Sequence, residues 1–347
     1  MSAPHGCGLG VAPPRMNAPH GRARLEAESG MALVIVLLGL SLVLLVVSEF
    51  VQTIRLEAAT TANFRRGFVA THLAEAGYQR AVVEILAEAR SEELDSQGRL
   101  VFRRAETTDL ERPQAPSRLD LALGGERFSY RITDESARIN LNRASPDLLR
   151  RLLDTVGVER ETRDVIVDSI LDWIDPNEEH RLNGAESDYY LALPVPYRSK
   201  NAEFDSVDEL LQVRGMTREI LYGRETTPGL ADLLTVAGTG AINVNTVEAP
   251  VLRALGFAEA EIDLLVAKRP YANVGAVPGA VRRGTLRTRS DLFRIEAWGG
   301  GTAPTRTLVA VVRRGASVSG AGVVAPLTWV WRDAGHPAPA AEEPATR

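Results

Sequence analysis

The segment Met31–Val47 contains no charged residue over 17 consecutive positions, and this constrains the chain more than any other feature. At 1.5 Å per residue such a helix is roughly 26 Å long, close to the hydrocarbon thickness of a bilayer. A cleaved secretory signal has a shorter apolar core and a small-residue cleavage site directly after it. The segment therefore predicts a membrane-spanning helix that stays in the protein.

The helical pattern continues well beyond this span. No proline occurs between residues 31 and 90, and apolar residues recur at helical spacing, among them Val69, Leu73, Ala76, Val83 and Leu86. We expect one helix over residues 31–90, with residues 31–47 in the membrane. Arginines stand on both sides of the span, so the positive-inside rule does not decide its orientation.

Composition excludes several classes of protein. The single cysteine, Cys7, precedes the span, so the rest of the chain can form neither an internal disulfide nor a cysteine metal site. The net charge of -5 argues against a nucleic-acid binder. The chain has no G-x-S-x-G motif and no glycine-rich phosphate loop before a helix, and we predict that it is not an enzyme.

Strand and helix patterns divide the remainder. The sequence "GGERFSYRITDES" alternates, with Phe128, Tyr130 and Ile132 on one face, and predicts a strand. Between about 140 and 235 the pattern is helical, with Ser145 and Ser206 as expected N-caps and Glu209 completing a capping box. Strand-like segments return at "RSDLFRIEAWGG", "RTLVAVVRRG" and "LTWVWRD". The order of elements predicts an α+β fold.

Two stretches of the helical region resemble each other. "ARINLNRASPDLLRRL" (137–152) and "GAINVNTVEAPVLRAL" (240–255) both read I-N-x-N, then a turn and an apolar helix. We expect these asparagines to bond to backbone at the turn. The pattern also resembles helix-hairpin-helix DNA-binding repeats, but residues 140–225 carry 11 Lys or Arg against 18 Asp or Glu. That balance opposes phosphate binding.

The loop 171–190, "LDWIDPNEEHRLNGAESDYY", is the densest candidate site. Asp172 and Asp175 are three residues apart and share a helix face. Carboxylates packed together without partners cost stability, and a hard cation such as Ca²⁺ resolves the conflict. The candidate ligands are Asp172, Asp175, Asn177, Glu186 and Asp188. The alternative is an exposed loop, or carboxylates paired with Arg181 and Arg198. Elsewhere, Asp134 and Arg138 are expected to form a local structural pair.

Gly30 followed by Met31 and an apolar helix resembles a type IV prepilin leader, although Glu28 and Ser29 stand where such leaders often carry basic residues. The resemblance implies that a prepilin peptidase cuts after Gly30 and that the new N-terminus is methylated. The family usually has Glu five residues after the cut, where this chain has Ile35. In pilins that Glu is thought to neutralise the N-terminal amine of the subunit ahead, so Ile35 suggests a subunit with none ahead of it. In an ordinary single-span anchor Ile35 needs no such explanation.

Further pieces occur in a fixed order, namely "ITDESARINLN", "DWID", "GAE", "DYY", "PYRSKNAEFDSVDELLQVRGMT", "INVNT" and "VVRR". Together they resemble the minor pseudopilin K family of type II secretion systems over about residues 28–332. The resemblance implies a pilin-like α/β domain with an antiparallel sheet, interrupted by an all-helical domain. The expected division is a leader at 1–30, the helix at 31–90, the pilin-like domain at 91–139 and 286–333, a helical domain with two related units at 140–285, and a disordered tail at 334–347.

The resemblance also implies a function. Such a subunit caps the tip of a periplasmic pseudopilus, without catalysis, from a single-pass anchor in the inner membrane with its C-terminal head in the periplasm. Its expected partners are pseudopilins I and J, the prepilin peptidase, the inner-membrane secretion platform and membrane lipid, with no nucleic acid. It implies a calcium site that carries over to Asp172, Asp175, Glu186 and Asp188, while Asn177 and Ser187 stand where the family often has Asp.

Two other functions stay open at this stage. One is a membrane-anchored DNA-uptake protein that uses the helix-hairpin-helix-like repeats. The other is a single-span, metal-stabilised binding protein outside any pilus.

Overall fold

The computed structural model describes residues 23–87, 91–103, 115–224, 227–278, 285–300, 306–316 and 322–333. Most of the predicted leader, residues 1–22, and the predicted tail, residues 334–347, lie outside the described residues; of residues 23–30, Gly30 included, only the helical backbone is described. The chain forms two compact units, Met1–Arg66 and Gly67–Arg347, and each is described by itself.

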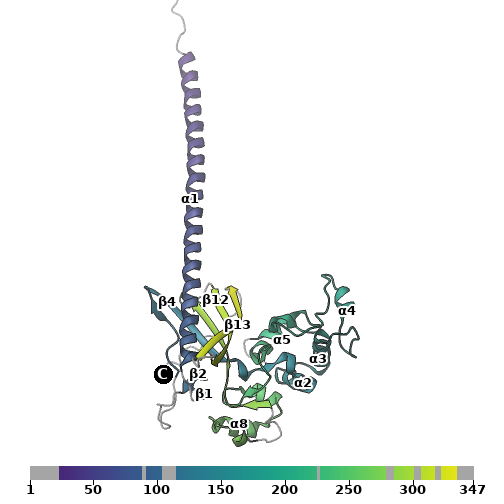
Figure 1. Cartoon of the computed structure of the whole chain (residues 1–347). Coiled ribbons are helices and arrows are strands. Elements are labelled where there is room, and N and C mark those ends of the chain that lie inside the picture. The colour runs from purple at the N-terminus through teal and green to yellow at the C-terminus, as the bar shows by residue number, and fades with distance from the viewer. Residues whose placement is uncertain are drawn as a thin grey trace, which may run out of the picture. The chain divides into compact units, whose positions relative to one another are not determined.

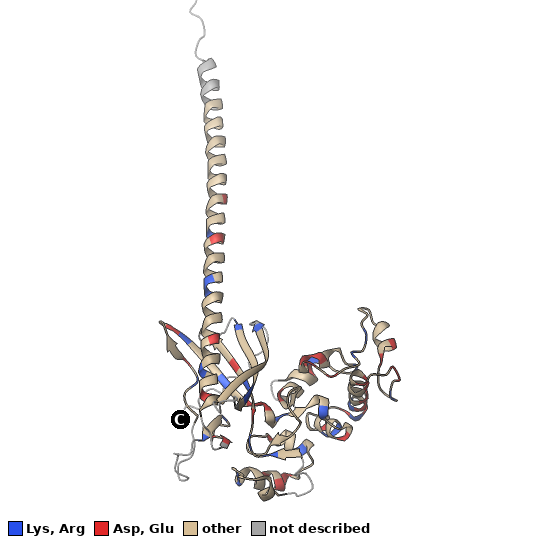
Figure 2. Ribbon diagram, viewed as in Figure 1, with Lys and Arg blue, Asp and Glu red and all other residues tan. Residues whose placement is uncertain are grey.

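The first unit is helical where it is described. Helix α1, Ala23–Leu86, begins before the predicted start at residue 31 and ends four residues before the predicted end at residue 90 (Figure 1). Every side chain from residue 31 to residue 66 is exposed. By length and composition α1 can cross a membrane, since its most apolar window has a mean hydropathy of 3.0 and is 0% buried. From residue 31 onward, the first charged residue of the helix is Glu49, which follows an uncharged stretch (Figure 2).

The second unit contains an antiparallel five-stranded sheet in the order β13-β12-β11-β4-β3. Residues of α1 from Leu73 to Ile85 pack against one face of it, and Phe128, Tyr130 and Ile132 point into the shared core, as the alternation predicted. The strands are β3 (Leu121–Leu123), β4 (Glu126–Asp134), β11 (Leu292–Gly299), β12 (Arg306–Ala316) and β13 (Gly322–Asp333). A separate hairpin is formed by β1 (Ser91–Leu94) and β2 (Leu100–Arg103).

The helical segment is inserted between two neighbouring strands. β4 ends at Asp134, and its cross-strand partner is Phe293 near the start of β11. The chain therefore leaves and re-enters the sheet at one point, so the insertion leaves the ladder between β4 and β11 intact. The α+β class predicted from the sequence is confirmed.

The inserted segment has a hydrophobic core of its own, which includes Ile166, Tyr190 and Leu252. Its helices are α2 (Pro146–Thr155), α3 (Arg160–Ile174), α4 (Ser187–Leu191), α5 (Arg218–Tyr222), α6 (Leu230–Leu233), α7 (Ala249–Ala254) and α8 (Glu259–Ala267). Four 3₁₀ turns are described, η1 (Glu135–Ala137), η2 (Leu141–Arg143), η3 (Val207–Gln212) and η4 (Val274–Ala276). Three pairs of two-residue strands complete it, β5 (Ile139–Asn140) with β8 (Leu234–Thr235), β6 (Gly223–Arg224) with β7 (Thr227–Pro228), and β9 (Ile242–Asn243) with β10 (Leu286–Arg287).

One predicted helix differs in type. Ser206 and Glu209 form the expected capping box, but the segment that follows, η3, is a 3₁₀ helix of 6 residues. Val213 is already extended, and Gly215 has a φ of +85°. The segment closes after six residues, and 3₁₀ helices are commonly used in such short pieces.

The two I-N-x-N stretches make matching contacts. The side-chain oxygens of Asn140 and Asn243 accept hydrogen bonds from the backbone two residues later, at 2.9 and 3.1 Å. The amide of Asn142 bonds both the N–H and the C=O of Phe204, and that of Asn245 does the same with Tyr271. The expected bonds from these asparagines to backbone are thus present, and in each stretch one asparagine fastens a distant segment of chain.

Close packing of α1 on the sheet requires glycine at the end of β11. A Cβ placed on Gly299 would lie 2.5 Å from the Cβ of Leu73 and 2.7 Å from the carbonyl oxygen of Ala70. Both neighbours belong to the helix, so an added methyl group forces α1 away from the sheet. Gly315 on β12 has no atom within 4 Å of the same position.

We therefore predict that Gly299→Ala lowers the free energy of unfolding by about 1–3 kcal/mol, the usual cost of overpacking. Gly315→Ala is the matched control and is expected to change it by less than about 0.5 kcal/mol, as for an exposed site. Thermal unfolding of the full chain in detergent, followed by circular dichroism, measures both. Equal transition temperatures for the two variants would contradict the packing argument.

Candidate functional site

The acidic loop begins where α3 ends. Pro176 disfavours helical backbone at Asp175, and Asp175 is extended, with φ of −75° and ψ of 153°. Asn177 shapes the turn that follows: its side-chain oxygen accepts from the N–H of Glu179 at 2.7 Å, and its NH₂ donates to Asp175 at 2.8 Å. The side-chain oxygen of Asn177 is therefore used within the loop.

Asp172 and Asp175 meet at Arg181. Asp172 is fully buried, and its carboxylate accepts hydrogen bonds from the guanidinium and the backbone N–H of Arg181. The same guanidinium lies 2.7 Å from Asp175. A Cβ on Gly184 would lie 1.8 Å from the Oδ2 atom of Asp172, so only glycine fits there. The alternative in which the carboxylates pair with arginines is therefore correct for Arg181. Arg198, the other arginine named in that alternative, is exposed.

Glu186 is the unusual member of the loop. Its side chain is 1% exposed, and neither carboxylate oxygen has a hydrogen-bond partner. Burial, together with the charges of Asp172, Asp175 and Glu178, raises the pKa of Glu186 to about 7, and the nearby Ser199 hydroxyl partly opposes this rise. An orphaned carboxylate beside three others is costly, which makes it the residue most in need of a cation.

Glu178 belongs to the site, although it was not among the ligands predicted from the sequence. It accepts hydrogen bonds from the hydroxyl of Ser187 and the amide of Asn201, both at 3.1 Å. Asn201 lies 23 residues away, so no local spacing predicts this contact. Asp188 is exposed and accepts from the N–H of Tyr189 at 2.7 Å, apart from the buried carboxylates.

The carboxylates around Glu186 are better suited to bind a hard cation than the whole set of ligands predicted from the sequence. Asp172, Asp175, Glu178 and Glu186 supply carboxylates, the ligands that Ca²⁺ prefers, against the single positive charge of Arg181. In the described part of the chain, no three His, Cys, Asp or Glu residues are arranged as a ready metal centre. Arg181 holds Asp172 and Asp175, so a cation would have to share or displace it.

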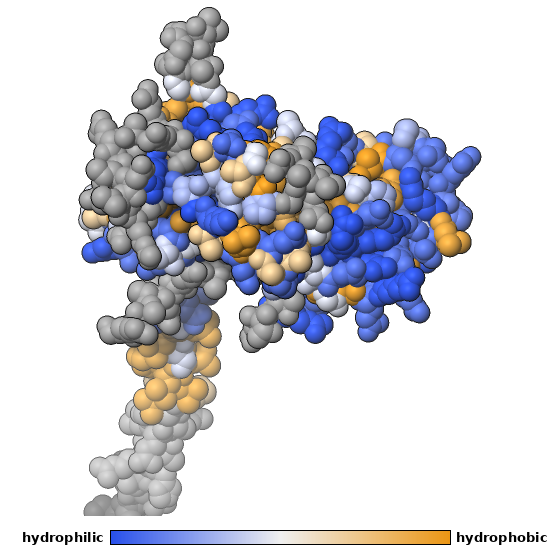
Figure 3. Space-filling model, turned by 90° about the horizontal axis from the view of Figure 1, so that it is seen from below, coloured by the Kyte–Doolittle hydropathy of each residue, from blue (hydrophilic) through white to orange (hydrophobic). Residues whose placement is uncertain are grey.

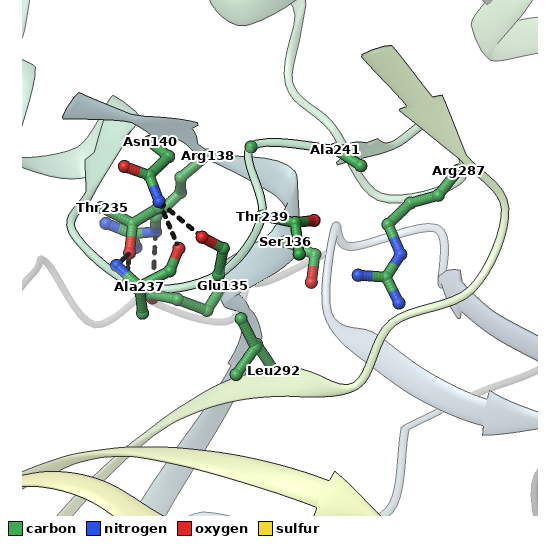
Figure 4. A pocket seen from close by; sticks show the side chains of 12 residues that line it. Glu135, Ser136, Arg138, Asn140, Thr235, Ala237, Thr239, Ala241, Arg287 and Leu292 are labelled. Atoms are coloured by element: carbon green, nitrogen blue, oxygen red, sulfur yellow. Dashed lines mark hydrogen bonds and ion pairs between the residues drawn. The ribbon is translucent and has the colours of Figure 1, made fainter. Parts of the chain in front are cut away.

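The junction between the sheet and the inserted segment is closed rather than open. Thr235 and Arg294 bind the carboxylate of Glu135 at 2.6–2.9 Å. Glu135 and Thr235 also line a cavity of about 10 Å³ (Figure 4). That volume holds one water at most, so this is not a ligand site. The expected pair of Asp134 and Arg138 is wrong. Arg138 lies 3.6 Å from Glu135, and Asp134 accepts only from uncharged groups, because the chain turns between the two residues.

Known proteins resemble both the sequence and the fold. A family model described as type II secretion system protein K matches residues 131–223. A type II secretion system protein K of Pseudomonas aeruginosa is 30% identical over 246 residues, which are 66% of this chain and 68% of that protein. The chain belongs to the type II secretion system protein K family. The resemblance inferred from the ordered motifs is confirmed.

Other members of the family match shorter parts. A protein K of Pectobacterium carotovorum is 36% identical over 129 residues, 35% of this chain and 38% of its own. A putative protein K of Escherichia coli K12 is 31% identical over 216 residues, 57% of this chain and 61% of its own. A chain in the crystal structure of the GspK-GspI-GspJ complex of enterotoxigenic Escherichia coli has the same fold. It is 17% identical, with a TM-score of 0.58 over 79% of this chain and 99% of that one.

The pKa of Glu186 predicts a pH dependence of stability. A carboxyl pKa raised from 4.5 to about 7 means that folding favours the protonated form. The unfolded chain loses this proton first as the pH rises from 4.5, so the stabilising contribution of the protonated form is lost up to about pH 7. Glu186→Gln is therefore expected to stabilise the metal-free protein at pH 8 by about 2–3 kcal/mol, and by close to nothing at pH 4.5.

Chemical unfolding in EDTA at both pH values measures this difference. Glu179→Gln is the control, because Glu179 lies in the same loop but is exposed. An equal effect of Glu186→Gln at the two pH values would show that the charged form of Glu186 does not destabilise the folded protein.

Proposed function

We propose that this chain is a minor pseudopilin that caps the tip of the periplasmic pseudopilus in type II secretion. In this proposal α1 anchors the protein in the inner membrane as a single span, the C-terminal head lies in the periplasm, and its role is assembly rather than catalysis. Membership of the protein K family and the uncharged, exposed segment 31–47 of α1 support it.

Ile35 carries the argument for the tip. It is one of the apolar side chains exposed along α1, with 69% of its surface accessible. A glutamate buried among apolar helices is costly unless it is paired, and in pilins its partner is the N-terminal amine of the subunit ahead. A subunit with Ile35 offers no such partner to a subunit ahead of it, so further growth at that end is not supported.

The proposed partners are pseudopilins I and J, because a chain of the same fold was solved in the GspK-GspI-GspJ complex. Van der Waals packing of the exposed apolar side chains of α1 against neighbouring helices would favour the association within the membrane. Maturation requires the prepilin peptidase to cut between Gly30 and Met31. Until the fibre assembles, lipid and the inner-membrane secretion platform surround the span.

We further propose that the acidic loop binds Ca²⁺. The proposed ligands are Asp172, Asp175, Asn177, Glu186 and Asp188. Glu178 is added to them because its charge acts on Glu186. When bound, the ion supplies positive charge to carboxylates whose one ion-pair partner in the described part of the chain is Arg181. The residues themselves hold the loop against α3, through Asp172, and against Ser187 and Asn201, through Glu178.

The location in the fibre is tested by co-expressing the full chain with its own I and J partners, the major pseudopilin and the prepilin peptidase. Gold-labelled antibody against residues 140–224 is expected to mark one end of each pseudopilus. Label spaced along the shaft would contradict the tip assignment.

Gly30→Leu serves as the control for this experiment, because the bulky side chain blocks cleavage. The uncut protein is expected to stay in the membrane fraction with an intact mass that includes the leader, and fibre ends are expected to lack label. Labelled fibre ends in this variant would show that capping does not require cleavage of the leader.

Calcium is tested separately by thermal unfolding of the full chain. At 100 times its dissociation constant, an ion that binds only the folded state adds about 2.7 kcal/mol, which raises the transition by several degrees. We expect this rise for the wild type with Ca²⁺ against EDTA, and less than half of it for Glu186→Gln. Equal transitions with and without Ca²⁺ in the wild type would reject the site.

A further inference from the structure

A second feature of the same end of the molecule is a hollow of about 230 Å³, lined by side chains of the segment 180–189 and by Arg214. Pockets for drug-sized ligands measure about 300–1,000 Å³. This hollow is smaller and open to solvent, so it fits one or two side chains of a peptide rather than a cofactor.

Arg214 gives the hollow a fixed positive charge. Its Nη1 atom donates to the carbonyl oxygen of Gly184 at 2.9 Å, and its guanidinium lies over the ring of Tyr189, 4.8 Å from the centroid. Within the described ranges Arg214 forms no ion pair with a carboxylate. A guanidinium held by stacking and by one carbonyl keeps further N–H groups available for a planar anion.

Leu182 supplies an apolar wall. It is 94% exposed, the highest value among the exposed large hydrophobic residues, and it lines the hollow with Tyr189, which is 37% exposed. Hydrophobic groups stand out among hydrophilic ones at the end of the molecule where α3 and α4 lie (Figure 3). A single exposed leucine is ordinary. Here, however, the leucine lies beside an aromatic ring and a guanidinium that is not paired with a described carboxylate. Together they offer an apolar surface and a positive charge, which are the two parts of a peptide-binding subsite.

Arg214 sets the sign of the charge that the hollow binds. Among the described residues that line the hollow, Asp188 is the one with a carboxylate, and it accepts a hydrogen bond from the N–H of Tyr189. The carboxylate is thus engaged by the protein itself, whereas Arg214 is engaged only by an uncharged carbonyl. Charge complementarity therefore favours an anion at Arg214, weakened by the negative charge of Asp188.

We propose that this hollow binds an extended acidic peptide segment, in which a carboxylate side chain pairs with Arg214 and a neighbouring apolar side chain packs on Leu182 and Tyr189. The proposal does not depend on the position of the subunit in the fibre, and because Asp188 is also a proposed ligand of the cation in the loop, the site is tested without that cation.

Two capped tripeptides test the proposal on the full chain in phosphatidylcholine nanodiscs, in EDTA and at low salt. The probes are acetyl-Leu-Asp-Leu-amide and acetyl-Leu-Asn-Leu-amide, which differ only in charge. Calorimetric titration is expected to show about tenfold tighter binding of the Asp probe, as for one charge-assisted bidentate contact. Equal binding of the two probes, or no binding of either, would overturn the proposal.

Matched variants locate the effect. Arg214→Gln is expected to abolish the preference for the Asp probe, while Arg214→Lys keeps part of it. Arg218→Gln is the control, because Arg218 also lies over a tyrosine ring, that of Tyr222 at 5.2 Å, but does not line the hollow. A preference that survives Arg214→Gln in a protein with unchanged thermal unfolding, or that Arg218→Gln removes equally, would place the binding elsewhere.

Two further substitutions separate the charged and apolar parts. Asp188→Asn removes the opposing charge and is expected to tighten binding of the Asp probe about threefold, with little change for the Asn probe. Leu182→Ala is expected to weaken both probes about equally, because it removes apolar contact alone. Weaker binding of the Asp probe to Asp188→Asn would contradict the assigned role of Arg214.

Discussion

The carboxylate of Asp134 holds the two parts of the head together. It is buried at the last position of β4 and accepts hydrogen bonds from the N–H of Ser136 and the NH₂ of Asn243, both at 2.8 Å, and from the hydroxyls of Thr246 and Ser290. Burial raises its pKa, and the four donors oppose that rise. Loss of any donor leaves a buried carboxylate less well compensated, which costs more than the hydrogen bond itself contributes. The sheet and the inserted segment are therefore joined by a polar contact at the point where the insertion begins and ends.

This contact explains why two similar I-N-x-N stretches end up with different roles. Asn140, in the first, donates its amide to the loop carbonyls of Ala237 and Gly238, within the inserted segment. Asn243, in the second, donates to Asp134 and Ser290 instead. The backbone geometry around the two asparagines is alike, because both side-chain oxygens cap the turn two residues later. One copy of the motif stabilises the insertion, and the other fastens it to the sheet.

The sequence predicted those features that depend on residues close together along the chain. The caps at Ser145 and Ser206, the buried face of β4 and the α+β order follow from spacing alone, and the ordered motifs predicted the family. The partners of Asp134 did not follow, since Asn243 and Thr246 are 109 and 112 residues away. Arg138, four residues from Asp134, was the only cation that local reasoning could offer. In the acidic loop the same limit applied. The sequence offered Arg181 as one possible partner of the carboxylates, but it predicted neither the burial of Glu186 nor the role of Glu178, which depend on how α4 and the segment near Asn201 fold back.

Gly184 links the two halves of the acidic loop. On one side its Cα has no room for a side chain, because Asp172 fills that space, and on the other its carbonyl oxygen holds Arg214. The buried carboxylates around Glu186 and the guanidinium of Arg214 therefore share one rigid point of contact. A change in the charge around Asp172 that moves this backbone also moves the hydrogen bond that orients Arg214. Neutralising the carboxylates would lower the negative potential near Arg214, so the cation proposed for the loop and the anion proposed for the hollow would each favour binding of the other.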